Sequence, residues 1–204
     1  MPNVLDKLVY SFLHPVVTLI VGMPTYNTMV YRIYQISSNA SSTQTTLGGG
    51  KIGFLTLTVS PMVYATLSST SFIKPANPGP APETPMNTTG IKQTAIRYRF
   101  TPETELYTLL QNIDKSLKQQ LLEDVEDIYV RFPKEKYVGY GKLPCLEVIY
   151  HLKENYYKIT LAELKLNMAW MNAPNNINDP FKSIIKQIET AVDFADAGKV
   201  LYTP

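Results

Sequence analysis

Apolar side chains recur at three- and four-residue spacing along most of this chain, and this period constrains its fold more than any other feature. Between Asp114 and Arg131, leucine, valine, isoleucine and tyrosine form one such stripe, with lysine, glutamine and glutamate opposite. This is the pattern of a helix that buries one face and exposes the other. Further stripes follow Pro144, Thr160 and Pro180. The sequence therefore predicts a mainly α-helical fold.

Caps and prolines mark the expected starts of these helices. A polar residue followed by proline is a strong start signal, and a threonine three residues before a glutamate forms a capping box. From these signals and the apolar spacing, five helices are expected to begin near Thr101, Asp114, Pro144, Thr160 and Asp179. The first should reach about Ile113, the second about Arg131, and Gly198 should end the last. Residues 91–204 are thus expected to form a helical bundle.

The first half of the chain combines helical and extended patterns. An apolar stripe predicts a helix over residues 25–38, and Ser60-Pro61 starts a brief second helix. Residues 37–50 are rich in Ser, Thr, Asn and Gly, which predicts a mobile loop. Residues 51–59 partly alternate and are rich in β-branched and aromatic residues, which predicts a strand or hairpin arm. The expected fold is a mainly α, capsid-like helical bundle with a short β-hairpin or strand in its N-terminal half.

Five prolines between Lys74 and Gly90 make the strongest break in the chain. Proline removes a backbone donor and favours extended conformations. A linker or surface loop is therefore expected over residues 75–90, between an N-terminal arm, helix and β-hairpin element over 1–74 and the helical bundle over 91–204. A length of 204 residues also fits a single domain formed by both halves.

Charge and composition favour contacts with protein over contacts with nucleic acid. The formal net charge is +2, and charged residues make up 18% of the chain, below the average of about 25%. A nucleic-acid interface normally shows clustered lysine and arginine, and the chain has no such run. Trp170 and the 14 tyrosines suit a ligand pocket or an interface, although core packing is expected for most of them.

Features of secreted proteins are weak in this sequence. Cys145 is the only cysteine, which excludes an internal disulfide and suits a reducing compartment. The apolar stretch over residues 8–23 is split by His14-Pro15, which argues against a signal peptide. Acceptor patterns for glycosylation begin at Asn39 and Asn87, and both are interpreted as plain loops. A cytoplasmic location is expected.

The run Gly48-Gly49-Gly50-Lys51 departs from a phosphate-binding loop at two positions. That loop needs a further glycine five positions before its last one, and a serine or threonine after its lysine to reach magnesium. Thr45 and Ile52 occupy these positions. A flexible hairpin loop is expected instead.

Cys145 and His151 are the one nucleophile and base that lie close in sequence. Six residues along a helix turn the chain through about 600°, which places the two on different faces, whereas a catalytic pair needs contact. A zinc site that added His14 would lack a fourth protein ligand and has no supporting spacing. The acidic residues of 123–127 are expected on a solvated face. The alternative is a hydrolase in which Cys145 or His151 has catalytic partners from distant parts of the sequence. No catalytic, cofactor-binding or metal-binding residue is assigned, and the chain is not expected to be an enzyme.

Several short segments follow one another in the order seen in a known family. They are His14 to Thr18, Pro24 to Tyr26, Gly48 to Gly50, Leu55 to Leu67, Pro75 to Gly79, Leu117 to Leu122 and Ile188 to Gly198. Together they resemble the Gag-like proteins of copia-type long-terminal-repeat retrotransposons of diatom, oomycete and related genomes. The resemblance extends over most of residues 16–202.

The resemblance implies an α-helical capsid domain that self-associates into virus-like particles around the RNA of the element. It also implies a second capsid domain and often a zinc knuckle, so the chain is expected to be an N-terminal fragment or a shortened relative. Its expected partner is a second copy of itself, with RNA held through regions outside this chain and neither a membrane nor a small-molecule substrate involved. The alternative is a domesticated Gag-derived interaction or RNA-binding adaptor without catalytic activity.

Overall fold

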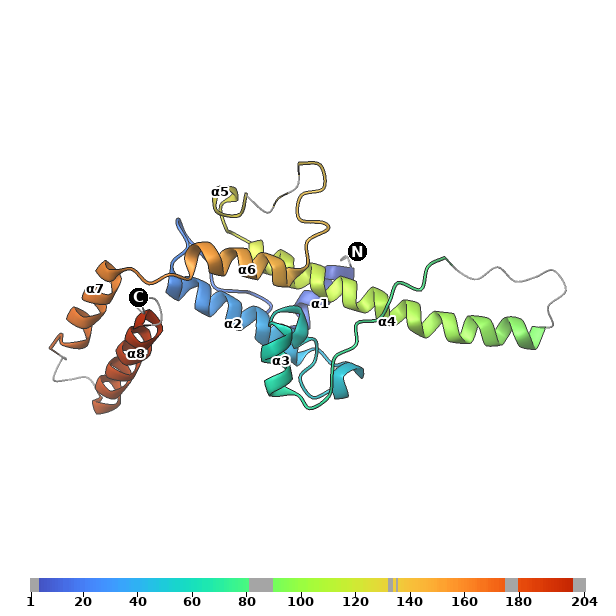
Figure 1. The fold of residues 1–204 in the computed structure, drawn as a ribbon, viewed down its shortest axis with the longest axis horizontal. Helices are drawn as coiled ribbons and strands as arrows, with labels where there is room; N and C mark the ends of the chain where they lie inside the picture. Colours follow the sequence, from blue (N-terminus) through green and yellow to red (C-terminus); the bar gives the residue numbers. More distant parts are fainter. Residues whose placement is uncertain (1–3, 81–89, 132–133, 135, 175–179, 200–204) are drawn as a thin grey trace.

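The computed structural model describes residues 4–80, 90–131, 134, 136–174 and 180–199 of the 204-residue chain. These residues form α-helices and short 3-10 helices and contain no β-strand, which confirms the prediction of a mainly α fold (Figure 1). The helices are α1 (Val4–Tyr10), α2 (Tyr26–Ser42), η1 (Leu47–Gly49), η2 (Leu55–Leu57), α3 (Pro61–Leu67), α4 (Gly90–Leu122), α5 (Asp127–Val130), α6 (Cys145–Tyr156), α7 (Leu161–Met171) and α8 (Phe181–Lys199).

The hydrophobic core lies where α2, α4 and α6 pack against one another (Figure 1). Fully buried side chains from these three helices include Met29, Ile36, Ile113, Leu117, Leu121, Val148, Ile149 and Leu152. The segment between α1 and α2 adds Phe12, Val17 and Ile20. Residues from both sides of the proline-rich segment therefore share one core. Residues 75–80 of that segment form neither helix nor strand, and residues 81–89 lie outside the described residues.

Helix α4 is one continuous helix where the sequence predicted two, so the expected starts at Thr101 and Asp114 were wrong. Pro102 lies inside α4, where it removes one backbone donor. The helix is solvent-exposed at this point, as Tyr98 is 80% exposed, so water can satisfy the carbonyl that proline leaves unbonded. Asp114 does not cap α4; its side chain accepts a hydrogen bond of 3.0 Å from the backbone N–H of Cys145 and so caps α6.

The C-terminal end of α4 also differs from the prediction. The helix ends at Leu122, not near Arg131, and the short helix α5 follows it. Asp124 lies between them with φ of 58°, in the left-handed region that commonly follows the end of a helix. The chain direction therefore changes before α5.

The strand predicted over residues 51–59 was wrong, because this segment forms turns and η2. Gly53 has φ of 50°, and a Cβ at this position would lie 2.4 Å from the carbonyl oxygen of Ser41, so the segment is folded tightly against the end of α2. The backbone N–H of Phe54 donates to the carbonyl of Ala40 at 2.8 Å. The apolar residues that suggested alternation bury Phe54 and Leu57 in the core.

Helix α2 continues to Ser42, so the loop expected from residue 37 begins later than predicted. The hydroxyls of Ser41 and Ser42 donate to the carbonyls of Ser38 and Asn39, each at 3.0 Å. These bonds stay within the helix and let polar residues extend it.

Other start signals are confirmed. Ser60 caps α3 with Pro61 at its first position, and Thr160 and Glu163 form the predicted capping box at the start of α7. Helix α8 begins at Phe181 as expected but continues through Gly198 to Lys199. Gly198 instead allows close packing, because a Cβ there would lie 2.7 Å from the side chain of Leu164 in α7.

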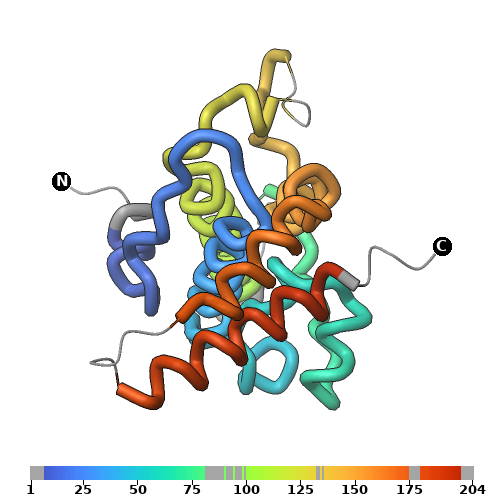
Figure 2. Tube along the Cα trace, turned by 90° about the vertical axis from the view of Figure 1, so that its left-hand side faces the viewer, coloured from blue at the N-terminus to red at the C-terminus, as the bar shows by residue number. Residues whose placement is uncertain are grey.

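Helices α7 and α8 pack side by side as a hairpin near the N-terminal end of α2, beyond the core of α2, α4 and α6 (Figures 1 and 2). In the residues that the structure describes, no helix is both long and apolar enough to cross a membrane.

Candidate functional site

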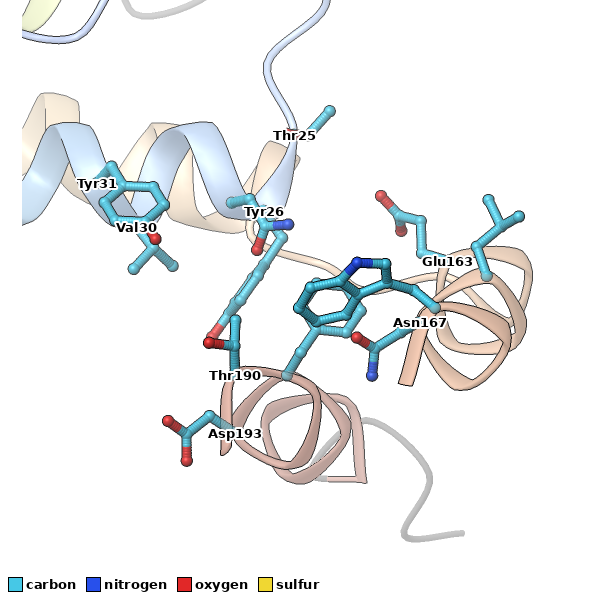
Figure 3. A pocket seen from close by; sticks show the side chains of 12 residues that line it. Thr25, Tyr26, Val30, Tyr31, Glu163, Asn167, Thr190 and Asp193 are labelled. Carbon is cyan, nitrogen blue, oxygen red and sulfur yellow. The ribbon is translucent and has the colours of Figure 1, made fainter. Parts of the chain in front are cut away.

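A cleft of about 720 Å³ separates the first turns of α2 from the α7–α8 hairpin (Figure 3). Its walls come from α2 and from the consecutive helices α7 and α8, which are far from α2 in sequence. The lining residues are Thr25, Tyr26, Asn27, Val30, Tyr31, Glu163, Leu166, Asn167, Trp170, Thr190, Asp193 and Phe194. The cleft is therefore the place where the hairpin meets the rest of the molecule.

Tyr26 makes the aromatic contact between α2 and the hairpin. Its ring packs edge-on against Tyr157, with ring centroids 4.7 Å apart, and against Phe194 of α8 at 5.7 Å. Figure 3 shows Tyr26 projecting from α2 toward the hairpin. Thr25 fixes the start of α2 through a capping box with Thr28. The contact thus depends on the first turn of α2.

Side chains on α7 and α8 tie the two helices together through backbone carbonyls. Asn167 donates from its amide to the carbonyl of Ala191 at 2.8 Å, and Gln187 donates to the carbonyl of Trp170 at 2.7 Å. Neither bond involves a charged group. The hairpin is held by side-chain hydrogen bonds and by the close approach at Gly198.

The polar groups of the cleft do not form a catalytic set. Glu163 accepts hydrogen bonds from the N–H and hydroxyl of Thr160, at 2.7 and 2.8 Å, so its carboxylate serves the capping box. Among the described lining residues there is no histidine, cysteine or lysine. The cleft offers aromatic and apolar surface with amides and hydroxyls at its edges, which suits contact with a protein surface.

The hairpin exposes an unusual amount of apolar surface. Helix α7 is apolar around most of its circumference, yet none of its residues is buried. Leu166 is 70% exposed and Trp170 is 46% exposed. A helix that is apolar all round is normally buried, so α7 has the sequence of a covered helix and the exposure of an uncovered one.

Tyrosine and tryptophan were expected mainly in the core, and that expectation was wrong. Of the described tyrosines only Tyr64 is buried, and Trp170 lines the cleft. Tyr129, Tyr140, Tyr156 and Tyr157 are partly buried and pack against the core, and the ring centroids of Tyr129 and Tyr156 lie 5.9 Å apart.

Cys145 is fully buried in the core, at the first position of α6. Burial raises the pKa of its thiol, and the nearby Asp114 raises it further. A buried, protonated thiol is inert as a nucleophile. His151 lies half-buried on α6 with its Nδ1 3.3 Å from the side-chain amide of Asn155. The structure therefore gives Cys145 a packing role.

His14 and two buried amides form a polar network that holds the N-terminal segment. Asn39, fully buried in α2, accepts from the N–H of His14 at 2.7 Å and donates to its carbonyl at 2.9 Å. It also donates to the side-chain oxygen of Gln120 at 2.9 Å, and Gln120 donates to the carbonyls of His14 and Pro15. The acceptor pattern at Asn39 is thus enclosed in a helix, not in a loop as predicted; Asn87 lies outside the described residues.

Arg32 caps the end of α4 from the neighbouring helix. Its side chain is fully buried, and Nη1 donates to the carbonyls of Gln120 and Glu123 at 2.7 and 2.9 Å. Burial lowers the pKa of Arg32, while Asp124 and Glu123 raise it. A cation at a helix C-terminus is favourable because unpaired carbonyls gather there. Arg32 therefore joins α2 to α4.

The glycine-rich run forms a packed corner. Gly48 has φ of 57°, and a Cβ there would lie 2.2 Å from the hydroxyl of Tyr64. The glycines allow α3 to approach this turn, and no strand precedes it as a phosphate-binding loop requires.

The acidic residues of 123–127 are exposed, as predicted, and Asp127 pairs with Lys134 at 2.7 Å. In the described part of the chain, no group of three histidine, cysteine or carboxylate side chains is placed to hold a metal ion.

Sequence reasoning missed the hairpin surface as a candidate site. The prediction treated the apolar residues of α8 as one stripe, but together with Phe194 they cover about half of the helix circumference at 100° per residue. A single neighbouring helix covers less than half of the circumference, so the width of the apolar stripe could have indicated an exposed apolar surface on α8.

No family model, curated protein or solved structure matches this chain.

Proposed function

We propose that this chain is a structural, self-associating protein of the Gag capsid type, which acts in the cytoplasm through contacts between its own copies. The observation that carries the proposal is the exposed α7–α8 hairpin, in which an apolar helix has no buried residue. A contact with another protein surface would cover these side chains. The order of segments that resemble copia-type Gag proteins supports a capsid assignment for that contact.

The chemistry of the interior supports a structural role over a catalytic one. The single thiol is buried, and the cleft is lined by aromatic and apolar side chains with amides, hydroxyls and two carboxylates, one of which, Glu163, is engaged in helix capping. The net charge of +2 favours protein contacts over phosphate contacts, which need clustered basic residues. Proteins that build shells use the same weak surfaces many times, so modest contacts are sufficient for assembly.

The proposal is tested by measuring the mass of the purified chain by light scattering across protein concentration and salt, with negative-stain imaging of large species. We expect the mean mass to rise with concentration and regular rings, sheets or shells to form. A chain that stays monomeric at its highest soluble concentration would overturn the proposal. Salt-sensitive RNA binding by such a monomer would instead favour the adaptor alternative.

A further inference from the structure

Helix α8 carries two apolar stripes that face different directions. The inner stripe packs against α7 and includes the buried Ala191 and Gly198. The outer stripe, defined here as Phe181, Ile185, Ile188 and Val192, remains 42–73% exposed. The outer stripe is therefore a continuous apolar surface that no described part of the chain covers.

The spacing of the outer stripe is that of a helix pairing seam. Its members follow one another by four, three and four residues, which is the alternation of the two apolar positions of a heptad. A second helix laid along this stripe would meet apolar side chains at every turn.

The charges of α8 identify the helix that fits this seam. Lys182 and Lys186 lie near the start of α8, and Glu189 and Asp193 lie near its middle, all four exposed. Lys182 lies in the first turn of α8, where the helix macrodipole disfavours a cation. The pattern also places like charges four residues apart, which weakens an isolated helix. Lys186 and Glu189, three residues apart, form the one close opposite-charge pair among the four, so the pattern gives α8 little net stabilisation by itself.

The same pattern is complementary to a second copy of α8 that runs in the opposite direction. An antiparallel pair centred near Gln187 sets Phe181 opposite Val192 and Ile185 opposite Ile188. It brings Lys182 between Glu189 and Asp193 of the other copy, and Lys186 near both Lys186 and Glu189 of that copy. Because the pair is two-fold symmetric, each contact between different residues forms twice. A parallel pair would set like charges together.

We propose that two copies of this chain pair through the outer stripe of α8 in an antiparallel arrangement. This inference rests on the proposed self-association and names the surface that produces it. A stripe of four side chains makes a small contact, as suits an assembly that gains strength from repetition.

The test exchanges the charges in three variants of the full chain. Lys182→Glu/Lys186→Glu makes all four of these positions acidic, and Glu189→Lys/Asp193→Lys makes all four basic. Each alone is expected to weaken self-association about tenfold or more, because like charges then face each other across the pair. An equimolar mixture of the two should restore pairing, and so should the variant that carries all four substitutions. Restoration by the fourfold variant is specific to the antiparallel arrangement.

An apolar variant provides a second measurement. Ile188→Ser is expected to weaken self-association, whereas Ile128→Ser, at an isoleucine that is 70% exposed on α5, should leave it unchanged. Circular dichroism and the melting temperature establish that each variant is folded. Sedimentation equilibrium reports the dissociation constants.

The outcomes separate the inference from the function it rests on. If the unchanged chain does not self-associate, the proposed function fails. If it self-associates with a dissociation constant that neither the charge variants nor Ile188→Ser alters, the α8 inference alone fails. Self-association then uses another surface of the chain. Loss in the single-sign variants without recovery in the mixture would likewise overturn the antiparallel pairing.

Discussion

Replacing Asn39 by alanine should destabilise the fold strongly, although Asn39 lies in a run of small polar residues that is typical of a loop. The side chain makes three hydrogen bonds, two with the backbone of His14 and one with the side chain of Gln120. Asn39→Ala leaves the N–H of His14 without its acceptor and the side-chain oxygen of Gln120 without its donor. Gln120 keeps its own two bonds to the N-terminal segment, so the segment loses only part of its attachment.

The expected loss follows from these two unpaired groups. An unsatisfied polar group in the interior costs about 1–3 kcal/mol, and water partly reaches His14, so we expect a loss of about 3 kcal/mol for the pair. For a chain of this size, a loss of 1 kcal/mol lowers the melting temperature by about 2–4 °C, which predicts a decrease of about 9 °C.

The assay is urea unfolding followed by circular dichroism, with Asn27→Ala as the matched control. Asn27 lies on the same helix and is exposed, so its replacement should change the free energy of unfolding by less than about 0.5 kcal/mol. If Asn39→Ala lost less than about 1 kcal/mol, or no more than the control, the network would not hold the N-terminal segment as argued.

Three further predictions concern the interior. Gly48→Ala should lower the free energy of unfolding by about 2 kcal/mol through strain and contact with the hydroxyl of Tyr64, and adding Tyr64→Phe should recover part of the loss in urea titrations; no recovery would refute the steric reason. Cys145 should react with a thiol reagent only at the rate of unfolding, since its thiol is buried and protonated; fast labelling of the folded chain would contradict this. Burial raises the pKa of Asp114 above its unfolded value, so its protonation favours the folded state. The stability of the native chain relative to Asp114→Asn should therefore fall as pH rises from about 4, and a constant difference would refute the assignment.

The sequence predicted helices well where the signal is local. The cap at Ser60 and the capping box at Thr160 start helices as expected, because both depend only on neighbouring residues. The start expected at Thr101 failed because the same residues are compatible with a helix interior when the next turns are helical and exposed. The helix start expected at Asp114 failed because the side chain of Asp114 caps α6 instead, through the backbone N–H of Cys145, 31 residues away. Neither outcome can be predicted from residues that are close in sequence.

The strand over residues 51–59 failed for a steric reason. Gly53 brings the chain within contact distance of the end of α2, and burial of Phe54 and Leu57 then stabilises a turn in place of an extended strand. A short apolar run is compatible with both outcomes, and only the approach to α2 decides between them. The buried network of Asn39 and Gln120 was equally hidden, because single amides carry no periodic signal.

The two parts of the fold differ in how they are stabilised, and this difference connects stability with assembly. The core of α2, α4 and α6 is closed by buried apolar side chains and by the bonds of Arg32 and Asn39. In the hairpin, the only buried residues among those described are Ala191 and Gly198. A second copy on the outer stripe of α8 would bury apolar surface that the hairpin cannot bury by itself. Because any partner that binds only the folded form stabilises it, the hairpin should become more resistant to unfolding as protein concentration rises, while the core should not.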